Sequence, residues 1–155
     1  MKKKFSRTLV VLMILAIITT AAVCFASENV GTVKVVQTQC RTTVFDPDTG
    51  RKLGTVPKGA VFEYLGHAHE TPDHIIVRIG KVFGNISPKD LKLKNVNSFG
   101  ESAVLKKTAL RFRPGGKIIT WVKKKSQVNV ISNCSTWTFV IADGVGGYIL
   151  GENLT

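Results

Sequence analysis

The sequence of 155 residues has little cysteine, few acidic residues and no segment with the pattern of a long helix. It contains 3 cysteines, 2 tryptophans, 2 tyrosines and 10 acidic residues, against 22 lysines and arginines. No pair of cysteines has the spacing of a zinc finger, which excludes a structural zinc domain of that kind. The lack of long helical periodicity after the N-terminal segment excludes a helix bundle.

Motifs of the common hydrolases and phosphate-binding enzymes are also missing. No serine lies in a Gly-x-Ser-x-Gly turn, there is no His-Glu-x-x-His sequence, and no glycine-rich phosphate loop precedes a helix. Cys40 or Cys134 could pair with a histidine as a nucleophile, but a papain-like catalytic domain needs about a hundred residues of its own. The chain has none to spare, so we expect a non-enzymatic protein that uses no cofactor.

The N-terminal segment has the order of an export signal. A cationic start, residues 1–7, precedes an unbroken apolar run, residues 9–18, and then small residues up to position 26. The apolar run is at the short end for a bilayer span and lacks a cationic stop-transfer flank. We therefore predict a signal peptide, residues 1–26, and no membrane span after its cleavage. A retained anchor is the alternative, and the bulky Val23 disfavours lipid attachment at Cys24.

Removal of that segment leaves a basic chain. The leader contains four of the 22 lysines and arginines and none of the 10 acidic residues, so 18 basic residues face 10 acidic ones and the net charge is +8. Positive charge outside the cytosol favours anionic surfaces such as wall polymers, lipid head groups or glycans, through an attraction that weakens with salt. Plain solubility is the alternative explanation of this charge.

Two parts of the chain carry the same pattern of short strands and turns. Without gaps, residues 56–65 align with residues 122–131, and residues 84–87 align with residues 147–150. Repetition at this period indicates a modular architecture. The candidate strands are rich in β-branched and aromatic residues, which are typical of strands.

The turns between these strands are short and regularly spaced. Asp143-Gly144, for example, is a strong signal for a two-residue β-hairpin turn. Many short strands at regular spacing favour a small barrel or sandwich. We therefore predict an all-β fold of two tandem small modules, each a barrel or a sandwich, residues 33–94 and 103–155, joined by a polar linker, residues 95–102.

The second module carries an ordered series of motifs. Residues 110–154 contain an apolar-x-apolar-Arg strand, a Pro/Gly turn, a lysine-rich turn before a Val-x-Val strand, then Trp-x-x-Val, Asp-Gly and Gly-Tyr-Ile before a terminal leucine. With these motifs the module resembles the bacterial Src-homology-3 family. The first module departs from this pattern, because His74 stands where the tryptophan would be and Asn85 replaces the tyrosine. The most characteristic positions are Trp137, Val140, Gly147, Tyr148 and Leu154.

The resemblance implies a fold and a class of ligand. The family folds as compact five- or six-stranded barrels, commonly in tandem in exported bacterial proteins, and its members often bind peptidoglycan peptides or other wall-associated ligands. We therefore expect an exported bacterial protein, secreted or envelope-associated, that binds peptidoglycan or an anionic wall polymer. Docking to another secreted or envelope protein is the first alternative. Salt-sensitive binding of anionic surfaces or nucleic acid is the second, with nucleic acid disfavoured as a partner.

The candidate ligand-binding residues are aromatic or cationic. Trp137 and Tyr148 offer flat amphipathic surfaces, unless their rings serve mainly in packing. Arg111 and Arg113 alternate with Leu110 and Phe112, so we expect the arginines to face solvent and the apolar side chains to face inward. Arginines in that position can form charge-assisted hydrogen bonds to carboxylates.

A basic turn follows Trp121. It either attracts anions or is a solvated turn that discourages association between strands. An exposed Trp121 ring beside this turn would favour surface binding. The complete set of candidate ligand-binding residues is Arg111, Arg113, Trp121, Lys123, Lys124, Lys125, Trp137 and Tyr148.

Cys40 and Cys134 permit one disulfide between the modules in an oxidising compartment. The sequence does not show whether their Cα atoms come within bonding distance, so a pair of free thiols is the alternative.

All three histidines, His67, His69 and His74, fall in one short polar segment that also contains Glu70 and Asp73. Their spacing matches no closed structural zinc pattern, so we predict no metal site. The same residues would suit a loop whose charge changes with pH.

Overall fold

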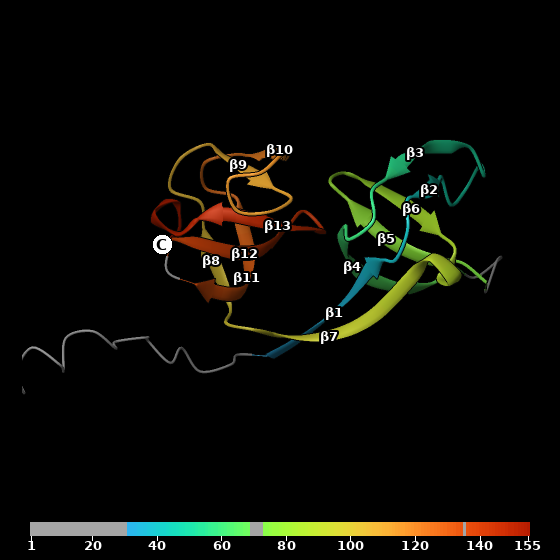
Figure 1. Cartoon of the computed structure of the whole chain (residues 1–155), viewed down its shortest axis with the longest axis horizontal. Coiled ribbons are helices and arrows are strands. Elements are labelled where there is room, and N and C mark those ends of the chain that lie inside the picture. Colours follow the sequence, from blue (N-terminus) through green and yellow to red (C-terminus); the bar gives the residue numbers. More distant parts are fainter. Residues whose placement is uncertain (1–30, 69–72, 135) are drawn as a thin grey trace, which may run out of the picture.

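The computed structural model describes residues 31–68, 73–134 and 136–155, and these form an antiparallel, almost entirely β structure with thirteen strands (Figure 1). The only helical elements of these residues are two single 3₁₀ turns, η1 (Pro88–Asp90) and η2 (Gly151–Asn153). The prediction of an all-β fold is confirmed. The predicted signal peptide, residues 1–26, lies outside the described residues. Within the described ranges, no helix is long and apolar enough to cross a membrane.

The first module contains seven strands in the spatial order β3-β2-β6-β5-β4-β1-β7. Alternating β-branched residues such as Val36, Val77 and Ile86 point into its core and are fully buried. The strands are β1 (Gly31–Thr38), β2 (Thr42–Phe45), β3 (Lys52–Val56), β4 (Val61–His67), β5 (Ile75–Ile79), β6 (Val82–Ile86) and β7 (Leu91–Ser98).

The second module contains six strands in the spatial order β10-β9-β13-β12-β11-β8. Leu110, Val140 and Ile149 are fully buried at its centre. The strands are β8 (Glu101–Ala103), β9 (Thr108–Arg111), β10 (Ile118–Val122), β11 (Gln127–Cys134), β12 (Trp137–Ala142) and β13 (Val145–Leu150).

Strand pairing in the second module repeats that of the first. Phe45 pairs with Asn85 at one point of the ladder, and Arg111 pairs with Tyr148 at the equivalent point. Both modules have an irregularity at the same place, after Tyr64 in β4 and after Val130 in β11. The register therefore makes Asn85 the counterpart of Tyr148, as the sequence alignment predicts.

Each module has a hydrogen bond between two polar side chains at an equivalent position. The hydroxyl of Thr42 donates a hydrogen bond to Asp90 in the first module. In the second module the side-chain amide of Asn153 donates to the hydroxyl of Thr108 over 2.9 Å. Because these residues lie in β2, η1, η2 and β9, each bond ties a 3₁₀ turn to the strand that it covers. Buried polar groups paired in this way avoid the cost of lost solvation.

The structure corrects the predicted linker. Residues 95–98 belong to β7, which pairs along its whole length with β1, and residues 101–102 begin β8. Strand β7 is exposed on both faces over most of its length, as at Lys92 and Leu93, whereas β1 buries Val35 and Val36. A mostly exposed strand that is held by backbone hydrogen bonds to a neighbouring strand needs no alternating hydrophobic pattern.

The turn between β2 and β3 depends on one carboxylate. Asp46 Oδ1 accepts hydrogen bonds from the backbone N–H groups of Thr49 (2.9 Å) and Asp48 (3.0 Å). These bonds, chiefly the one from Thr49, hold the pKa of Asp46 below its usual value. The ionised form therefore stabilises the turn.

Replacement of Asp46 by asparagine tests this turn. We expect Asp46→Asn to lower the urea midpoint at pH 7, because a neutral amide accepts these bonds more weakly. A lowered folded-state pKa contributes stability that is complete above the unfolded pKa, about 3.9, and is lost as the pH falls through the folded pKa. The difference between wild type and variant should therefore close in acid. A difference independent of pH would contradict this role.

Candidate functional site

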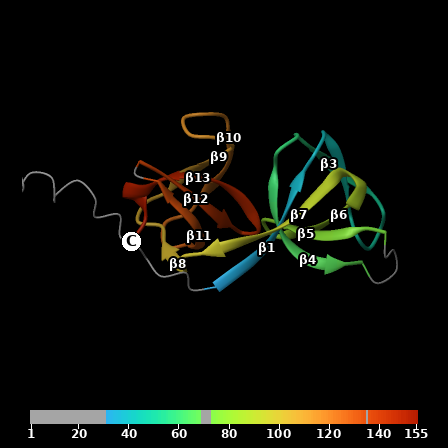
Figure 2. The same ribbon diagram turned by 60° about the horizontal axis from the view of Figure 1, so that its bottom comes forward.

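The two modules meet through paired strands. Val145 and Gly146 of β13 pair with Phe62 and Val61 of β4, so the ladder continues from one module into the other. The two lobes lie side by side, and the β1–β7 ribbon crosses from one lobe towards the other (Figure 2). Their buried hydrophobic residues form one cluster, with Phe62 and Val145 where the cores meet. A shared strand ladder and a shared hydrophobic cluster therefore connect the modules, in addition to the chain segment between them.

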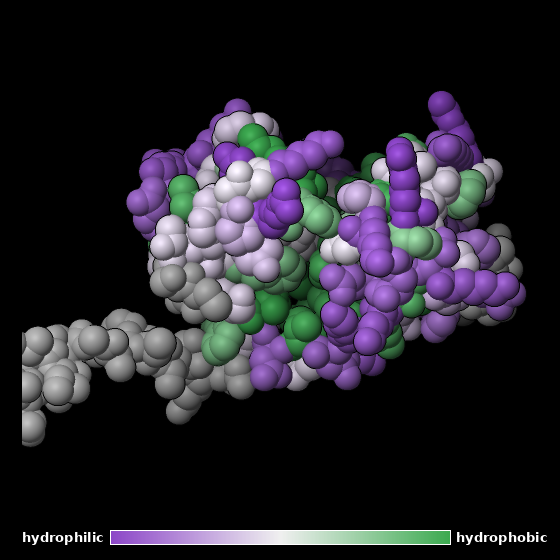
Figure 3. Space-filling model, viewed as in Figure 1, coloured by the Kyte–Doolittle hydropathy of each residue, from purple (hydrophilic) through white to green (hydrophobic). Residues whose placement is uncertain are grey.

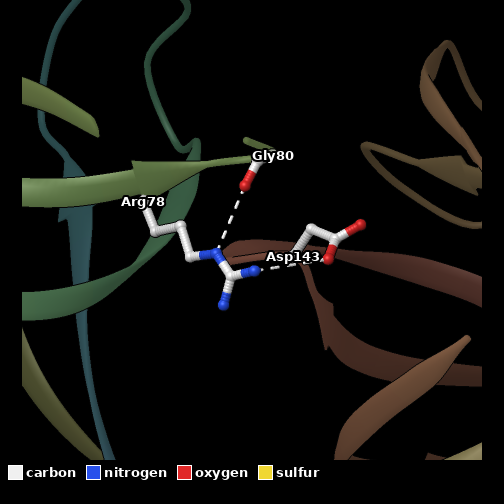
Figure 4. Close-up of polar contacts among 3 residues, drawn as sticks. All are labelled: Arg78, Gly80 and Asp143. Atoms are coloured by element: carbon white, nitrogen blue, oxygen red, sulfur yellow. Dashed lines mark hydrogen bonds and ion pairs between the residues drawn. The ribbon is translucent and has the colours of Figure 1, made fainter. Parts of the chain in front are cut away.

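The tip of the β12–β13 hairpin inserts into the first module. Glu63 N donates to Gly144 O over 2.8 Å, and Gly80 N donates to Asp143 O over 2.9 Å. The Arg78 guanidinium lies between the Gly80 carbonyl, 3.2 Å away, and the Asp143 carboxylate, 3.6 Å away (Figure 4). Because both side chains of the ion pair are substantially exposed, the backbone bonds hold this contact more than the charges do.

Glycine allows this close approach. Gly144 has φ of 79°, and a Cβ there would lie 2.5 Å from Arg78 Cβ and 2.6 Å from the Arg78 carbonyl oxygen. A Cβ at Gly146 would lie 2.8 Å from Val61 Cβ. Asp143 also has positive φ, 49°, so the turn is of the two-residue type that the Asp-Gly sequence predicts.

One groove of the junction has a volume of about 520 Å³, and we name it the Tyr148 groove. Hydrophobic side chains gather in the hollow between the lobes, with hydrophilic ones around them (Figure 3). Its walls are Val35, Gln37, Lys58, Gly59, Val61, Lys94 and Val96 of the first module and Phe112, Ile131, Ser132, Phe139 and Tyr148 of the second.

The Tyr148 groove combines aromatic and cationic side chains. The rings of Phe139 and Tyr148 meet edge to face, with centroids 5.0 Å apart. From the opposite wall, Lys94 Nζ donates to Gln37 Oε1 over 2.6 Å, and the exposed Lys58 lies nearby on the same wall. Of the two ion pairs among the described residues, neither involves Lys58 or Lys94. The groove therefore offers a flat ring and cations available to a carboxylate or phosphate.

A second groove lies at the same junction, and we name it the Trp121 groove. Its volume is about 380 Å³, and its lining is mainly apolar. Phe112 borders both grooves, with Cζ 3.3 Å from where a Cβ would stand on Gly59. Its walls are Val56, Pro57, Ala60, Val61, Phe62, Ile79 and Gly80 of the first module and Phe112, Ile119, Thr120, Trp121, Val122, Ala142, Asp143, Val145 and Gly146 of the second.

Trp121 is 55% exposed, with Lys107 Nζ 5.3 Å from its ring centroid. It also borders a small pocket of about 180 Å³ with Trp137 and Arg111. Arg111 is already engaged there, because its Nη1 donates to the Gly116 carbonyl over 2.7 Å. Trp137 is half-buried and pairs with Leu150 across the ladder.

The candidate ligand-binding residues predicted from the sequence therefore lie at several separate sites. Arg111, Trp121 and Trp137 share one pocket, whereas Tyr148 lies in the groove against the first module. Arg113 is exposed in the β9–β10 turn, and the three lysines 123–125 form the exposed β10–β11 turn, which lines neither groove.

The structure corrects the expectation that Phe112 faces the core. It is half-buried at the module junction, because β9 ends at Arg111 and the ring is covered by Gly59 of the first module. Lys58 and Lys94 were not among the residues that the sequence singled out. No local motif marks them, because their significance comes only from facing Tyr148 across the junction.

The first module has no aromatic residues at the positions equivalent to Trp137 and Tyr148 of the second. By register His74 is the counterpart of Trp137, and Asn85 is the counterpart of Tyr148. Asn85 is only 6% exposed, and its Oδ1, like His74 Nδ1, has no hydrogen-bond partner among the residues that the structure describes. The first module thus contributes cations to the junction and no equivalent aromatic surface of its own.

Cys40 is an exposed free thiol, so the structure does not form the bridge to Cys134 that the sequence permits. Cys40 follows β1 in the first module, whereas Cys134 ends β11 in the second. A hydrogen bond to Asp90 is the main cause that raises the pKa of the Cys40 thiol. The thiol is therefore mostly protonated at neutral pH.

The segment that contains the three histidines is described only in part. His69 lies outside the described residues, whereas the ring of His67 meets that of Tyr64 with centroids 6.1 Å apart. Within the described ranges, no three His, Cys, Asp or Glu side chains are grouped closely enough to hold a metal ion.

No protein-family model and no curated protein sequence matches the chain. Among solved structures, the chain is similar to NlpC2 from Trichomonas vaginalis, 20% identical over 81% of this chain and 48% of that chain, with a TM-score of 0.35. NlpC1 from the same organism is 19% identical over 88% and 50%, with a TM-score of 0.34. The endolysin LysPBC5 CBD is 12% identical over 79% and 93%, with a TM-score of 0.32. The chain thus spans about half the length of the two Trichomonas proteins.

Proposed function

We propose that the protein is an exported, non-enzymatic binding protein of the bacterial cell envelope. The proposed ligand is an anionic wall component, either a peptidoglycan peptide with its carboxylates or a wall polymer with its phosphates. The observation that carries the proposal is the Tyr148 groove, where an aromatic ring of one module faces Lys58 and Lys94 of the other. The excess of basic residues supports the same class of ligand.

The groove suggests how such a ligand binds. The Tyr148 and Phe139 rings offer apolar area to the ligand backbone or sugar face, because aromatic side chains contribute contact area with little loss of rotamer freedom. Lys58 and Lys94 bind the anionic group by charge-assisted hydrogen bonds. Since the two walls belong to different modules, affinity depends on the modules keeping their mutual position.

Charge reversal in the groove tests the proposal. We expect the double variant Lys58→Glu and Lys94→Glu to lose at least about tenfold in retention on purified peptidoglycan, because a hydrogen bond to a charged group contributes about 1.5–3 kcal/mol and 1.4 kcal/mol is tenfold. Tyr148→Ala should also weaken retention. The matched control is Lys52→Glu with Lys81→Glu, which reverses two exposed lysines outside both grooves.

The assay uses peptidoglycan with and without its wall phosphate polymers, at low and high salt. Retention that survives polymer removal assigns the carboxylate ligand, whereas retention that requires the polymer assigns the phosphate ligand. Absence of retention on both materials, or an equal loss in the control variant, would overturn the proposal. Chromatography of the incubated peptidoglycan should show no new fragments, as expected of a protein without catalysis.

A further inference from the structure

Strand β10 is an exposed sheet edge with a hydrophobic sequence. Among the described residues it pairs only with β9, so its other side faces no strand. Ile118, Ile119 and Trp121 are 36%, 41% and 55% exposed. Proteins usually protect such an edge with charged residues, proline or a cover, because unpaired backbone groups bind other strands.

The equivalent edge in the first module is built differently. In the part of the chain that the structure describes, strand β3 pairs only with β2, and Leu53, between Lys52 and Gly54, is its one exposed large hydrophobic residue. Glycine and lysine are poor residues for an added strand to pack on. The contrast shows that this fold does not require a hydrophobic edge at β10.

A groove runs beside the hydrophobic edge. Ile119, Thr120 and Trp121 of β10 form one wall of the Trp121 groove, and Val56 and Pro57 of the first module form the opposite wall. In Figure 1, β10 and β3 lie on opposite sides of the junction. The ladder is irregular between Ile118 and Thr120, which places Ile119 as the extra residue of a bulge. A strand added to β10 would therefore find apolar space for its side chains.

The charges around the edge indicate the chemistry of the occupant. Lys117 precedes β10, Lys123 and Lys124 follow it, and Lys107 lies over the Trp121 ring. None of these lysines belongs to either ion pair found in the described part of the chain. An extended segment with apolar residues at its centre and acidic residues at both ends would complement this edge.

The same charges disfavour a second copy of this chain. If two β10 strands paired antiparallel about Thr120, Lys117 of each would lie opposite Lys123 of the other. Like charges directly opposite each other in a ladder are destabilising.

We propose that β10 is a docking edge for an extended, apolar segment of a partner protein flanked by acidic residues, which adds a strand to the β9–β10 hairpin. Main-chain hydrogen bonds to β10 supply affinity, and the Trp121 groove with the lysines supplies specificity. Strand β10 and the flanking lysines lie outside the lining of the Tyr148 groove that carries the proposed wall binding, although Val61 and Phe112 border both grooves.

The test uses a fluorescently labelled peptide, Glu-Glu-Val-Thr-Val-Thr-Val-Glu-Glu, and the mature protein. We expect saturable binding by anisotropy and slower amide hydrogen exchange in residues 118–122, because those amides gain partners. A peptide with lysine in place of every glutamate should bind at least about tenfold more weakly. A peptide with proline at alternate central positions should not bind, since it lacks the N–H donors.

Two variants locate the site on the protein. Ile119→Lys should weaken peptide binding and leave retention on peptidoglycan unchanged, whereas Leu53→Lys on β3 should change neither. The double variant Lys123→Glu and Lys124→Glu should bind the glutamate peptide more weakly, and the lysine peptide more tightly, than the wild type does. Absence of binding, equal binding of both peptides, or protection confined to another strand would overturn the proposal. A concentration-dependent dimer that protects β10 without peptide would assign the edge to a second copy instead.

Discussion

Replacement of Gly144 by alanine is expected to separate the two modules while each remains folded. A residue other than glycine in the left-handed region costs about 1–2 kcal/mol. The new Cβ would also lie 2.5 Å from Arg78 Cβ and 2.6 Å from the Arg78 carbonyl oxygen, and the backbone of β5 cannot move without breaking its own ladder. The hairpin tip must therefore withdraw. The bonds from Glu63 N to Gly144 O and from Gly80 N to Asp143 O are then lost.

Small-angle X-ray scattering measures this separation. The radius of gyration of Gly144→Ala should exceed that of the wild type, and retention on peptidoglycan should fall because the two walls of the Tyr148 groove move apart. Gly115→Ala is the matched control, since Gly115 also has positive φ, 65°, but no atom lies within 4 Å of its Cβ position. The control should keep the wild-type scattering. Identical scattering from wild type and Gly144→Ala would contradict the role of the hairpin tip.

A second interface variant separates steric overlap from backbone strain. A Cβ at Gly146 would meet Val61 Cβ at 2.8 Å and Phe139 Cζ at 2.9 Å, and Gly146 is not among the glycines with positive φ. Gly146→Ala should therefore increase the radius of gyration and lower retention on peptidoglycan, but less than Gly144→Ala does, because steric overlap acts there without backbone strain.

Much of the fold was accessible from the sequence because its strands carry their own signals. β5 reads Ile-Ile-Val-Arg-Ile and β12 reads Trp-Thr-Phe-Val-Ile-Ala, and both lie where β-branched and aromatic residues predict them. The turn at Asp143-Gly144 is also where its residues place it. These features are local, so a pattern of neighbouring residues is enough to find them.

The strands that sequence reasoning missed are held by partners distant in the chain. β3, Lys-Leu-Gly-Thr-Val, and β8, Glu-Ser-Ala, have weak strand propensity and form because β2 and β11 pair with them. The predicted linker, residues 95–102, includes the second half of β7 for the same reason, since β1 pairs with β7 along its whole length. Tertiary context decides strand formation in such polar segments.

The candidate site shows the same division. Tyr148 and Trp121 stand out by residue type, and the structure places both at the module junction. Lys58 and Lys94 do not stand out among 22 lysines and arginines. Only the pairing of β4 with β13 brings them to Tyr148, and no local pattern encodes how two modules dock.

Truncation of one isoleucine in each module should reveal that the modules unfold together. Ile86 and Ile149 occupy equivalent positions, and both are fully buried in the cluster that joins the modules. Replacement of a buried isoleucine by alanine costs about 2–5 kcal/mol through lost burial and the remaining cavity. With a urea m-value of about 1–3 kcal/mol/M, each variant should lower the unfolding midpoint by about 1 M or more.

Tryptophan fluorescence reports this coupling selectively, because both tryptophans, Trp121 and Trp137, belong to the second module. If the shared core and the β4–β13 ladder make unfolding cooperative, Ile86→Ala in the first module must lower the fluorescence midpoint as Ile149→Ala does. In the Gly144→Ala background, Ile86→Ala should lower only the circular dichroism transition of the first module. A fluorescence midpoint unaffected by Ile86→Ala in the otherwise wild-type chain would mean that the modules unfold independently. The junction would then be too weak to hold the two walls of the Tyr148 groove together.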